Sequence, residues 1–101
     1  MALLFIGTTD IPTAGTRVQI DNTSRMVVSI TFKARNGNTG NIYIGTISKV
    51  SSTNGFELRP NEAQTFTFPY RILSVPISDF WADTAAGGNG NDVDYMAILA
   101  P

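Results

Sequence analysis

Short stretches in which apolar and polar residues alternate recur along the chain, and turn-forming residues separate them. Asn41 to Gly45 alternates most clearly, with Ile42 and Ile44 on one face and Tyr43 on the other. Met26 to Lys33 alternates over a longer stretch. A period of two is typical of a half-buried antiparallel strand. Because no stretch of helical length has a period of 3.6, the sequence predicts an all-β protein.

The remaining strand-like stretches are equally short and are bounded by glycine, asparagine, proline or serine. They are Leu3–Ile6, Arg17–Asp21, Phe56–Leu58, Gln64–Phe68, Arg71–Ile77, Ser78–Asp83 and Asp92–Ala100. About eight such strands at this spacing predict an antiparallel β-sandwich, of which the jelly roll is one form. With 101 residues, the chain has room for one domain. We expect residues 1–15 to form an N-terminal strand or arm and residues 16–101 to form a single β-sandwich domain.

The turn signals predict which strands are neighbours. Arg17–Asp21 and Met26–Lys33 are expected to form a hairpin, and Ile42–Gly45 is expected to return beside Met26–Lys33. Pro60 and Asn61 suit the two central positions of a further turn. Gly7–Gly15 is expected to be a loop. Six apolar side chains of the central stretch are predicted core residues: Ile42, Ile44, Phe56, Leu58, Phe66 and Phe68.

The last stretch, Asp92–Ala100, carries apolar residues on both faces. Val93, Tyr95, Ala97 and Leu99 share one face, and Met96 and Ile98 share the other. Such a strand is either central in its sheet or covered by a partner. Pro76 interrupts the apolar run Arg71–Ile77, which favours an edge strand or a bend there.

Composition argues against catalysis. The chain has no histidine and no cysteine, so the commonest general base and the commonest metal ligands are missing. Asp79 and Asp83 would share a strand face about 13 Å apart, which is wider than the roughly 5–9.5 Å between the paired carboxylates of glycosidases. We therefore expect no enzyme and no cofactor, and keep a weak polysaccharide-acting enzyme built on these aspartates as the least favoured alternative.

The oxygen-rich segment Gly87–Asp94 has the look of a calcium loop, but it lacks the distal glutamate and the spacing. A flexible hairpin loop flanked by solvated aspartates is the favoured interpretation, so we expect no metal site. The net charge is −1 and the basic residues are scattered, which argues against nucleic acid as a partner. No apolar run approaches the roughly 20 residues of a membrane span. The first six residues lack the basic region of a secretory signal, so we expect the chain to be made in a cytoplasm and to leave it, if at all, without a signal peptide.

Two features are candidate protein interfaces. The apolar run of Leu3, Leu4, Phe5 and Ile6 is either an edge strand tucked into the core or an arm that packs on a neighbouring subunit. Trp81, the only tryptophan, points outward between two aspartates if Phe80 faces the core. With the opposite register, Trp81 is itself a core residue.

The stretches Asn41–Gly45 and Ser51–Glu62 resemble small β-sandwich virion proteins of tailed bacteriophages. In those proteins a strand of the type N-hydrophobic-Y-hydrophobic-G is followed by a loop T-N-G-aromatic-x-L-x-P-G-E and then by an apolar strand. The resemblance is strong over roughly residues 41–68. Asn61 stands where the family usually has glycine, and asparagine also tolerates the positive φ of such a turn.

This resemblance implies a structural role in a virus particle. Proteins of this family often act as capsid decoration or cement proteins, which bind the major capsid protein and commonly form homotrimers between capsomers. The expected location is then the virion, assembled in the cytoplasm of a host bacterium. The resemblance leaves a second role open, that of a receptor- or carbohydrate-binding module of a tail or head fibre, in which Trp81 would stack on a sugar.

Overall fold

The computed structural model describes residues 3–46, 49–51, 53–68, 75–85 and 91–100, and within them it contains almost only β-strands. The elements in chain order are β1 (Leu3–Ile11), β2 (Val18–Gln19), β3 (Met26–Ala34), β4 (Ile42–Gly45), β5 (Phe56–Leu58), β6 (Ala63–Thr67), β7 (Val75–Pro76), the 3₁₀ turn η1 (Ile77–Asp79), β8 (Trp81–Thr84) and β9 (Asn91–Leu99). Two antiparallel sheets pack face to face, which confirms the predicted all-β sandwich. Within the described ranges, no helix is long and apolar enough to cross a membrane.

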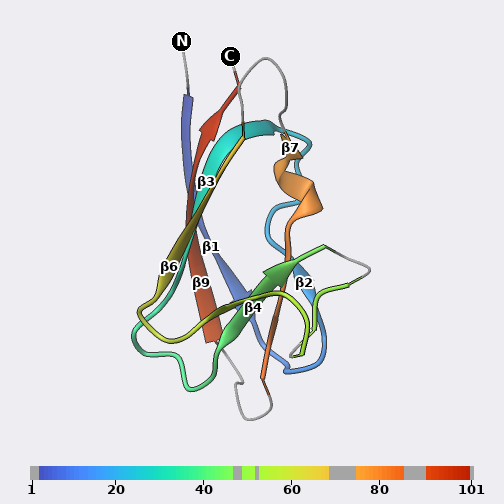
Figure 1. The fold of residues 1–101 in the computed structure, drawn as a ribbon, viewed down its shortest axis with the longest axis vertical. Coiled ribbons are helices and arrows are strands. Elements are labelled where there is room, and N and C mark those ends of the chain that lie inside the picture. Colours follow the sequence, from blue (N-terminus) through green and yellow to red (C-terminus); the bar gives the residue numbers. More distant parts are fainter. Residues whose placement is uncertain (1–2, 47–48, 52, 69–74, 86–90, 101) are drawn as a thin grey trace.

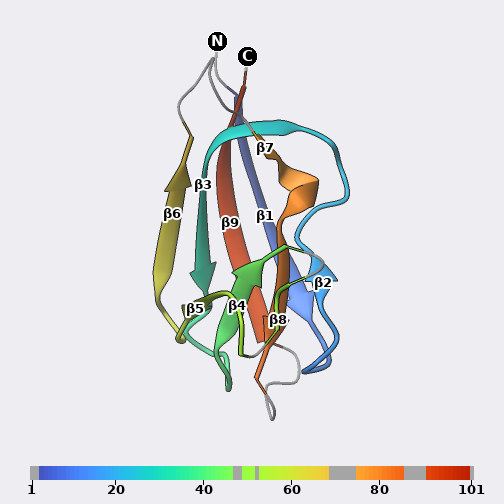
Figure 2. The same ribbon diagram turned by 45° about the vertical axis from the view of Figure 1, so that its right-hand side comes forward.

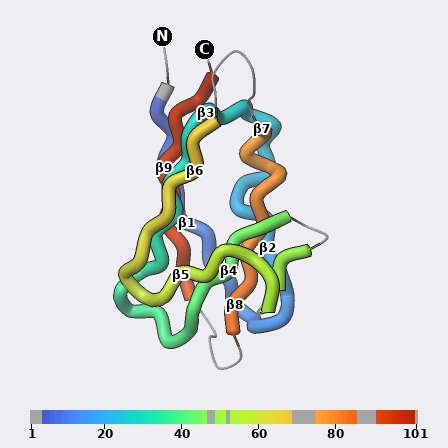
Figure 3. Tube along the Cα trace, in the orientation of Figure 1, coloured from blue at the N-terminus to red at the C-terminus, as the bar shows by residue number. Residues whose placement is uncertain are grey.

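The larger sheet has the strand order β1-β9-β3-β6, with β7 pairing beside the start of β3, and the smaller sheet has the order β2-β8-β4-β5. Figure 1 shows the larger sheet along the full length of the molecule, with the smaller sheet against its lower half and β7 and η1 beside its upper half. The 45° turn of Figure 2 separates β6, β3, β9 and β1 across the larger sheet. The tube in Figure 3 shows that the start of β1 and the end of β9 lie side by side.

The core lies between the two sheets. Its fully buried side chains include Ile11, Ile30, Phe32, Ile42, Ile44, Ile77 and Val93. Ile42, Ile44 and Leu58 were predicted correctly, and Phe66 and Phe68 are half-buried and pack against this core. The prediction for Phe56 was wrong, because its side chain is 58% exposed. It lies on β5, an edge strand of the smaller sheet, and its ring packs edge-to-face with that of Phe66, with ring centroids 5.0 Å apart.

Two predicted strand pairings were wrong. β2 pairs with β8 in the smaller sheet, whereas β3 pairs with β9 and β6 in the larger one, so the chain between β2 and β3 crosses from sheet to sheet instead of forming a hairpin. β4 likewise pairs with β5 and β8 and not with β3. Both corrections have one cause. Each apolar strand face must meet an apolar face of the opposite sheet, and a local hairpin would put both faces in the same sheet.

A β-bulge in β3 overturns the predicted facing of its first residues. The alternation of Met26–Lys33 predicts that Met26 and Val28 share a face with Ile30. The register against β9 shifts between Val27 and Ser29. Val27 is therefore fully buried, whereas Met26 is 39% exposed. One extra residue in a strand moves every side chain before it to the opposite face.

The bounds of two elements also differ from the prediction. β1 continues through Gly7 to Ile11, where a loop was expected. Ser78 and Asp79 lie in the 3₁₀ turn η1 after Pro76 and not in a strand. The turn at Pro60–Asn61 is as predicted, since Asn61 has φ of 75° and the amide of Glu62 donates to the carbonyl of Arg59 at 2.9 Å. The part of Arg71–Ile77 before Val75 lies outside the described residues.

Candidate protein-binding surface

Four apolar side chains are exposed on the outer face of the larger sheet, where β1 and β9 pair. Leu4 lies opposite Ile98 and Ile6 lies opposite Met96 in the strand register. Their side chains are 66%, 41%, 68% and 46% exposed, respectively. We call these four residues the β1–β9 patch. Large apolar side chains that adjoin one another on a surface commonly mark a binding site, whereas scattered ones do not.

The inner face of the same two strands explains why these side chains point outward. Phe5 and Tyr95 alternate with the patch residues and pack together on the core side, with ring centroids 6.0 Å apart. The guanidinium of Arg25 lies 4.8 Å from the centroid of the Phe5 ring. The Tyr95 hydroxyl donates a hydrogen bond to Oδ2 of Asp21 at 3.0 Å. This anchoring fixes the register, and the register directs Leu4 and Ile6 to the outside.

Asp21 and Tyr95 perturb one another. Burial of Tyr95, its hydrogen bond to Asp21 and the negative charge there together raise the pKa of the tyrosine to about 12. Burial alone would raise the pKa of Asp21, but hydrogen bonds from Thr23 and from Tyr95 outweigh it, and the pKa of this carboxyl is lowered. The pair therefore stays a neutral phenol and a carboxylate over the whole physiological range.

Hydroxyl groups border the patch on the side of β3. Ser29 lies opposite Ile98 and Thr31 lies opposite Met96. The hydroxyl of Thr31 is hydrogen-bonded to that of Thr65 on β6 at 2.8 Å. A groove of about 580 Å³ crosses this border. Its walls include Ile6, Thr8, Thr31, Lys33, Ala63 and Met96.

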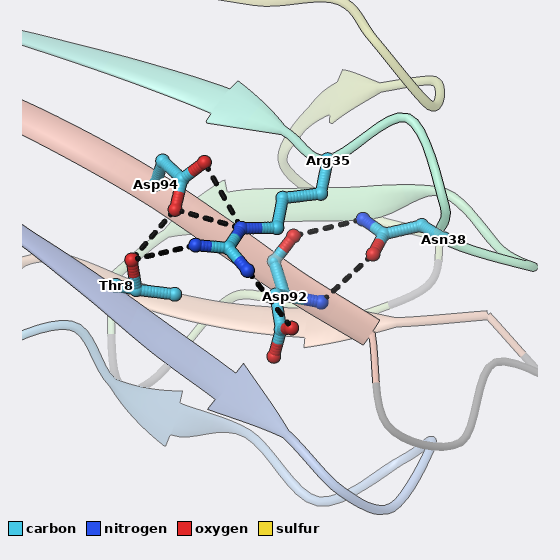
Figure 4. A network of polar contacts seen from close by, with 5 residues as sticks. All are labelled: Thr8, Arg35, Asn38, Asp92 and Asp94. Atoms are coloured by element: carbon cyan, nitrogen blue, oxygen red, sulfur yellow. Dashed lines mark hydrogen bonds and ion pairs between the residues drawn. The ribbon is translucent and has the colours of Figure 1, made fainter.

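The lower end of the same face carries a charged network (Figure 4). Arg35 donates from Nε to both carboxylate oxygens of Asp94, at 3.0 and 3.1 Å, and from Nη2 to the Thr8 hydroxyl at 3.3 Å. Thr8 in turn donates to Oδ1 of Asp94 at 2.6 Å. Asn38 holds the start of β9 by accepting from the amide of Asp92 and donating to its carbonyl, at 2.9 and 2.8 Å. The network ties β1, β9 and the end of β3 together.

Asp92 and Asp10 are directly opposed across β9 and β1. Burial and the hydrogen bond and charge of Asp10 raise the pKa of Asp92, and Arg35, whose Nη1 lies 3.9 Å from Oδ2 of Asp92, offsets this only in part. Like charges on opposed residues of a sheet are destabilising. The outer face thus has an apolar half and a charged half, and residues of both halves line the groove.

The structure separates the candidate interface residues. Leu4 and Ile6 belong to the patch, whereas Phe5 points to the core. Leu3 is opposite Leu99 in β1, and its side chain lies outside the described part. Trp81 is half-buried on the other sheet, where it lies opposite Gln19 and Gly45. Phe80 packs against the core, so Trp81 does point away from it.

Met96 and Ile98 were not among the predicted site residues, although the sequence carried their signal. β9 was noted as apolar on both faces, and it is indeed central, between β1 and β3. A central strand can still expose its outer face, and the alternation alone does not say which apolar residues of another strand lie next to it. The pairing with β1 supplies that information.

The predicted carboxylate pair does not share a strand. Asp79 is exposed in η1, whereas Asp83 is 3% exposed in β8. Oδ1 of Asp83 accepts hydrogen bonds from the amides of Gly15 at 3.0 Å and Thr84 at 2.8 Å, so this carboxylate organises a loop. Among the residues that the structure describes, no three histidine, cysteine or acidic side chains are grouped as metal ligands would be. Of the segment Gly87–Asp94, residues 87–90 lie outside the described ranges.

Comparison with known proteins gives a likeness of fold. No protein family matches the chain, and no curated protein is similar to it in sequence. Among solved structures, the IMPa metallopeptidase from Pseudomonas aeruginosa superposes with a TM-score of 0.58 at 11% identity. The same protein in complex with an O-glycopeptide gives 0.59, and in complex with T-antigen 0.56, both at 11% identity. The match covers 97% of this chain but only 12–13% of IMPa, so it concerns one small part of a much larger protein.

Proposed function

We propose that this protein is a non-catalytic structural module that docks on a larger assembly through the β1–β9 patch. In the form that the sequence resemblance implies, it is a capsid decoration protein of a tailed bacteriophage, and the major capsid protein is its partner. The observation that carries the proposal is the pair of exposed apolar cross-strand contacts, Leu4 with Ile98 and Ile6 with Met96.

The patch has the composition of a small protein interface. An apolar centre is bordered by the hydroxyls of Ser29 and Thr31, and charged groups lie at one end in Lys33 and Arg35. Protein interfaces commonly combine an apolar centre with a polar rim. The anchored strands hold the patch rigid, so little conformational entropy is lost on binding.

The expected affinity of one copy is modest. Roughly half of each patch side chain remains to be buried, and complete burial of such a side chain contributes about 1.5–3 kcal/mol. Four of them would then supply about 3–6 kcal/mol before the cost of association. A particle offers many equivalent sites, and partners linked on one lattice raise the overall affinity without any new contact.

The proposal is tested by loading purified protein onto particles that lack it. Met96→Lys places a charge in the patch and should reduce the amount retained on sedimented particles at least tenfold. Met26→Lys is the matched control, because Met26 is similarly exposed but lies at the start of β3, outside the patch. Circular dichroism establishes that both variants are folded. Equal retention of the two variants, or absence of the wild-type chain from purified virions, would contradict the proposal.

A second candidate is a carbohydrate-binding module, and the position of Trp81 favours it. The indole is half-buried and lies on the face of β8 opposite the core residue Ala82. Such an aromatic face can stack on a sugar ring. The structural neighbour IMPa has been solved with an O-glycopeptide and with T-antigen, which suggests these glycans as the first to try. Calorimetric binding that Trp81→Ala abolishes would support this role, and a silent glycan array would count against it.

A further inference from the structure

β1 is an edge strand with an unpaired side. Within the described parts of the chain, it pairs with β9 alone. Among the described residues, the backbone of Leu4–Gly7 makes no hydrogen bond outside that pairing. Every second residue of an edge strand points its N–H and C=O away from the sheet. These groups form a template that another β-strand can bind.

This edge lacks the usual protection against such pairing. Proteins guard sheet edges with very short strands, bulges, prolines or charged side chains. The other described edge strands are shorter than β1, with five residues in β6, three in β5 and two each in β2 and β7. β1 has nine residues in unbroken register, no basic residue, and Asp10 as its one charged side chain. Pro12 comes only after its end.

We infer that β1 pairs with β1 of a second copy, antiparallel and about a two-fold axis at Phe5, to form one continuous sheet across a homodimer. In this register Leu4 lies opposite Ile6 of the other copy on the outer face, and this contact occurs twice. A pairing centred on Ile6 would instead place Leu4 opposite Thr8. The register at Phe5 is therefore the one that matches every outward apolar side chain of the Leu4–Gly7 edge with another.

The charges of the strand agree with this partner. Asp10 is five residues from the proposed axis, so the two copies of Asp10 would be roughly 34 Å apart. That distance exceeds the Debye length of about 8 Å at physiological salt, so the two carboxylates do not oppose pairing. A parallel arrangement of the same two strands would place Asp10 beside Asp10.

The inference goes beyond the proposed docking function and gives it a geometry. A two-fold axis perpendicular to the sheet leaves both β1–β9 patches on the same side. The two patches then join across the axis, through Leu4 and Ile6, into a single apolar strip. A homodimer would meet a larger surface with twice the apolar area of one copy. It also differs from the homotrimer that the sequence resemblance implies, so oligomeric mass separates the two.

Site-directed disulfides test the register. The chain contains no cysteine, so Leu4→Cys and Ile6→Cys each introduce one thiol. Opposed residues of an antiparallel pair have Cα atoms about 4.5–5.5 Å apart, which is within the range that a disulfide spans. Under mild oxidation with diamide, an equimolar mixture of the two variants should give at least ten times more cross-linked dimer than either variant alone. Sedimentation equilibrium of the wild-type protein should give twice the monomer mass of 10.9 kDa.

Met96→Cys is the matched control, because Met96 is exposed on the same face but lies one strand further in. In the proposed dimer its two copies are three strand spacings apart, about 14 Å, and should not cross-link. Cross-linking of Met96→Cys at a similar yield would show face-to-face association and overturn the inference. Three other results would also overturn the inference. They are efficient cross-linking of Ile6→Cys alone, a monomeric or trimeric mass of the wild-type protein, and a mixture of Leu4→Cys and Ile6→Cys that does not cross-link. Met96→Lys introduced into the Leu4→Cys and Ile6→Cys mixture should leave cross-linking intact, which separates dimerisation from docking.

Discussion

Replacement of Gly7 by alanine gives a sharp test of how β1 is held. A Cβ at Gly7 would lie 2.4 Å from Oη, 2.6 Å from Cζ and 3.0 Å from Cε1 of Tyr95. Real Cβ contacts are not that short, so either the ring moves or β1 moves. Tyr95 is 6% exposed and its hydroxyl is bonded to Asp21, so the ring can move only if that bond is lost.

The cost follows from these two routes. Overpacking of a close-packed site costs about 1–3 kcal/mol, and loss of a hydrogen bond to a charged acceptor costs about 1.5–3 kcal/mol. We expect Gly7→Ala to lower the free energy of unfolding by about 2–4 kcal/mol, because a ring movement that relieves the overpacking breaks the hydrogen bond to Asp21. For a domain of this size, that corresponds to a fall in Tm of roughly 10–20 °C.

Urea and thermal unfolding measure this loss, and Gly37→Ala is the matched control. A Cβ at Gly37 meets nothing within 4 Å, so Gly37→Ala should leave the free energy of unfolding unchanged or raise it slightly. In a Tyr95→Phe background, the penalty of Gly7→Ala should shrink, because the nearest clashing atom is absent. Away from such a clash, alanine in a strand is favoured over glycine by roughly 0.5–1 kcal/mol. A neutral or stabilised Gly7→Ala would therefore refute the close packing of Tyr95 on β1.

Three further predictions concern charge and turn geometry. Asp10→Asn should raise the free energy of unfolding at neutral pH by roughly 0.2–1 kcal/mol. In urea titrations this gain should vanish as the pH falls through the raised pKa of Asp92, because Asp92 then loses its charge. Tyr95 has a folded pKa of about 12 against an ordinary value of 10.0, so its contribution to stability is complete below pH 10 and is lost as the pH rises toward 12. Tyr95→Phe should lack this loss of stability at alkaline pH. If Tyr95→Phe and the wild-type protein had the same pH profile, the contact between Tyr95 and Asp21 would be excluded. Asn61→Ala should lower the urea midpoint by an amount equivalent to about 1 kcal/mol, because alanine is disfavoured at a φ of 75°. Asn61→Gly should leave the midpoint unchanged. An equal loss of stability in the two variants would rule out backbone strain as the cause.

The fold class could be predicted from the sequence because local chemistry determines it. The alternation in β9 and the turn at Pro60–Asn61 depend on residues close together in the chain, and both were predicted correctly. The partner of each strand depends on which apolar faces meet in three dimensions, and no local pattern records that. The bulge in β3 could not be predicted either, because no residue between Met26 and Ser29 signals that the strand contains an extra residue. Phe56 was misplaced because burial depends on whether a strand is central or at an edge.

The candidate site was likewise predictable only as far as local sequence patterns reach. The apolar run at the N-terminus identified Leu4 and Ile6 as surface candidates, and the two-sided pattern of β9 identified Met96 and Ile98 as unusual. That these four side chains form one surface follows only from the pairing of two strands at opposite ends of the sequence. Trp81 was an independent candidate, and the other sheet holds it apart from the patch.

The central position of β9 has a consequence for how the chain folds during synthesis. β1 and the long β3 both pair with β9, which leaves the ribosome after every other described strand of the two sheets. Until then β1 has no partner within the larger sheet, and β3 lacks its one long neighbour. A sheet dominated by such distant contacts closes slowly, on the order of milliseconds to seconds. We expect a nascent chain stopped before Asn91 to remain unfolded and exposed to proteases, so the larger sheet forms only once translation has passed its final strand.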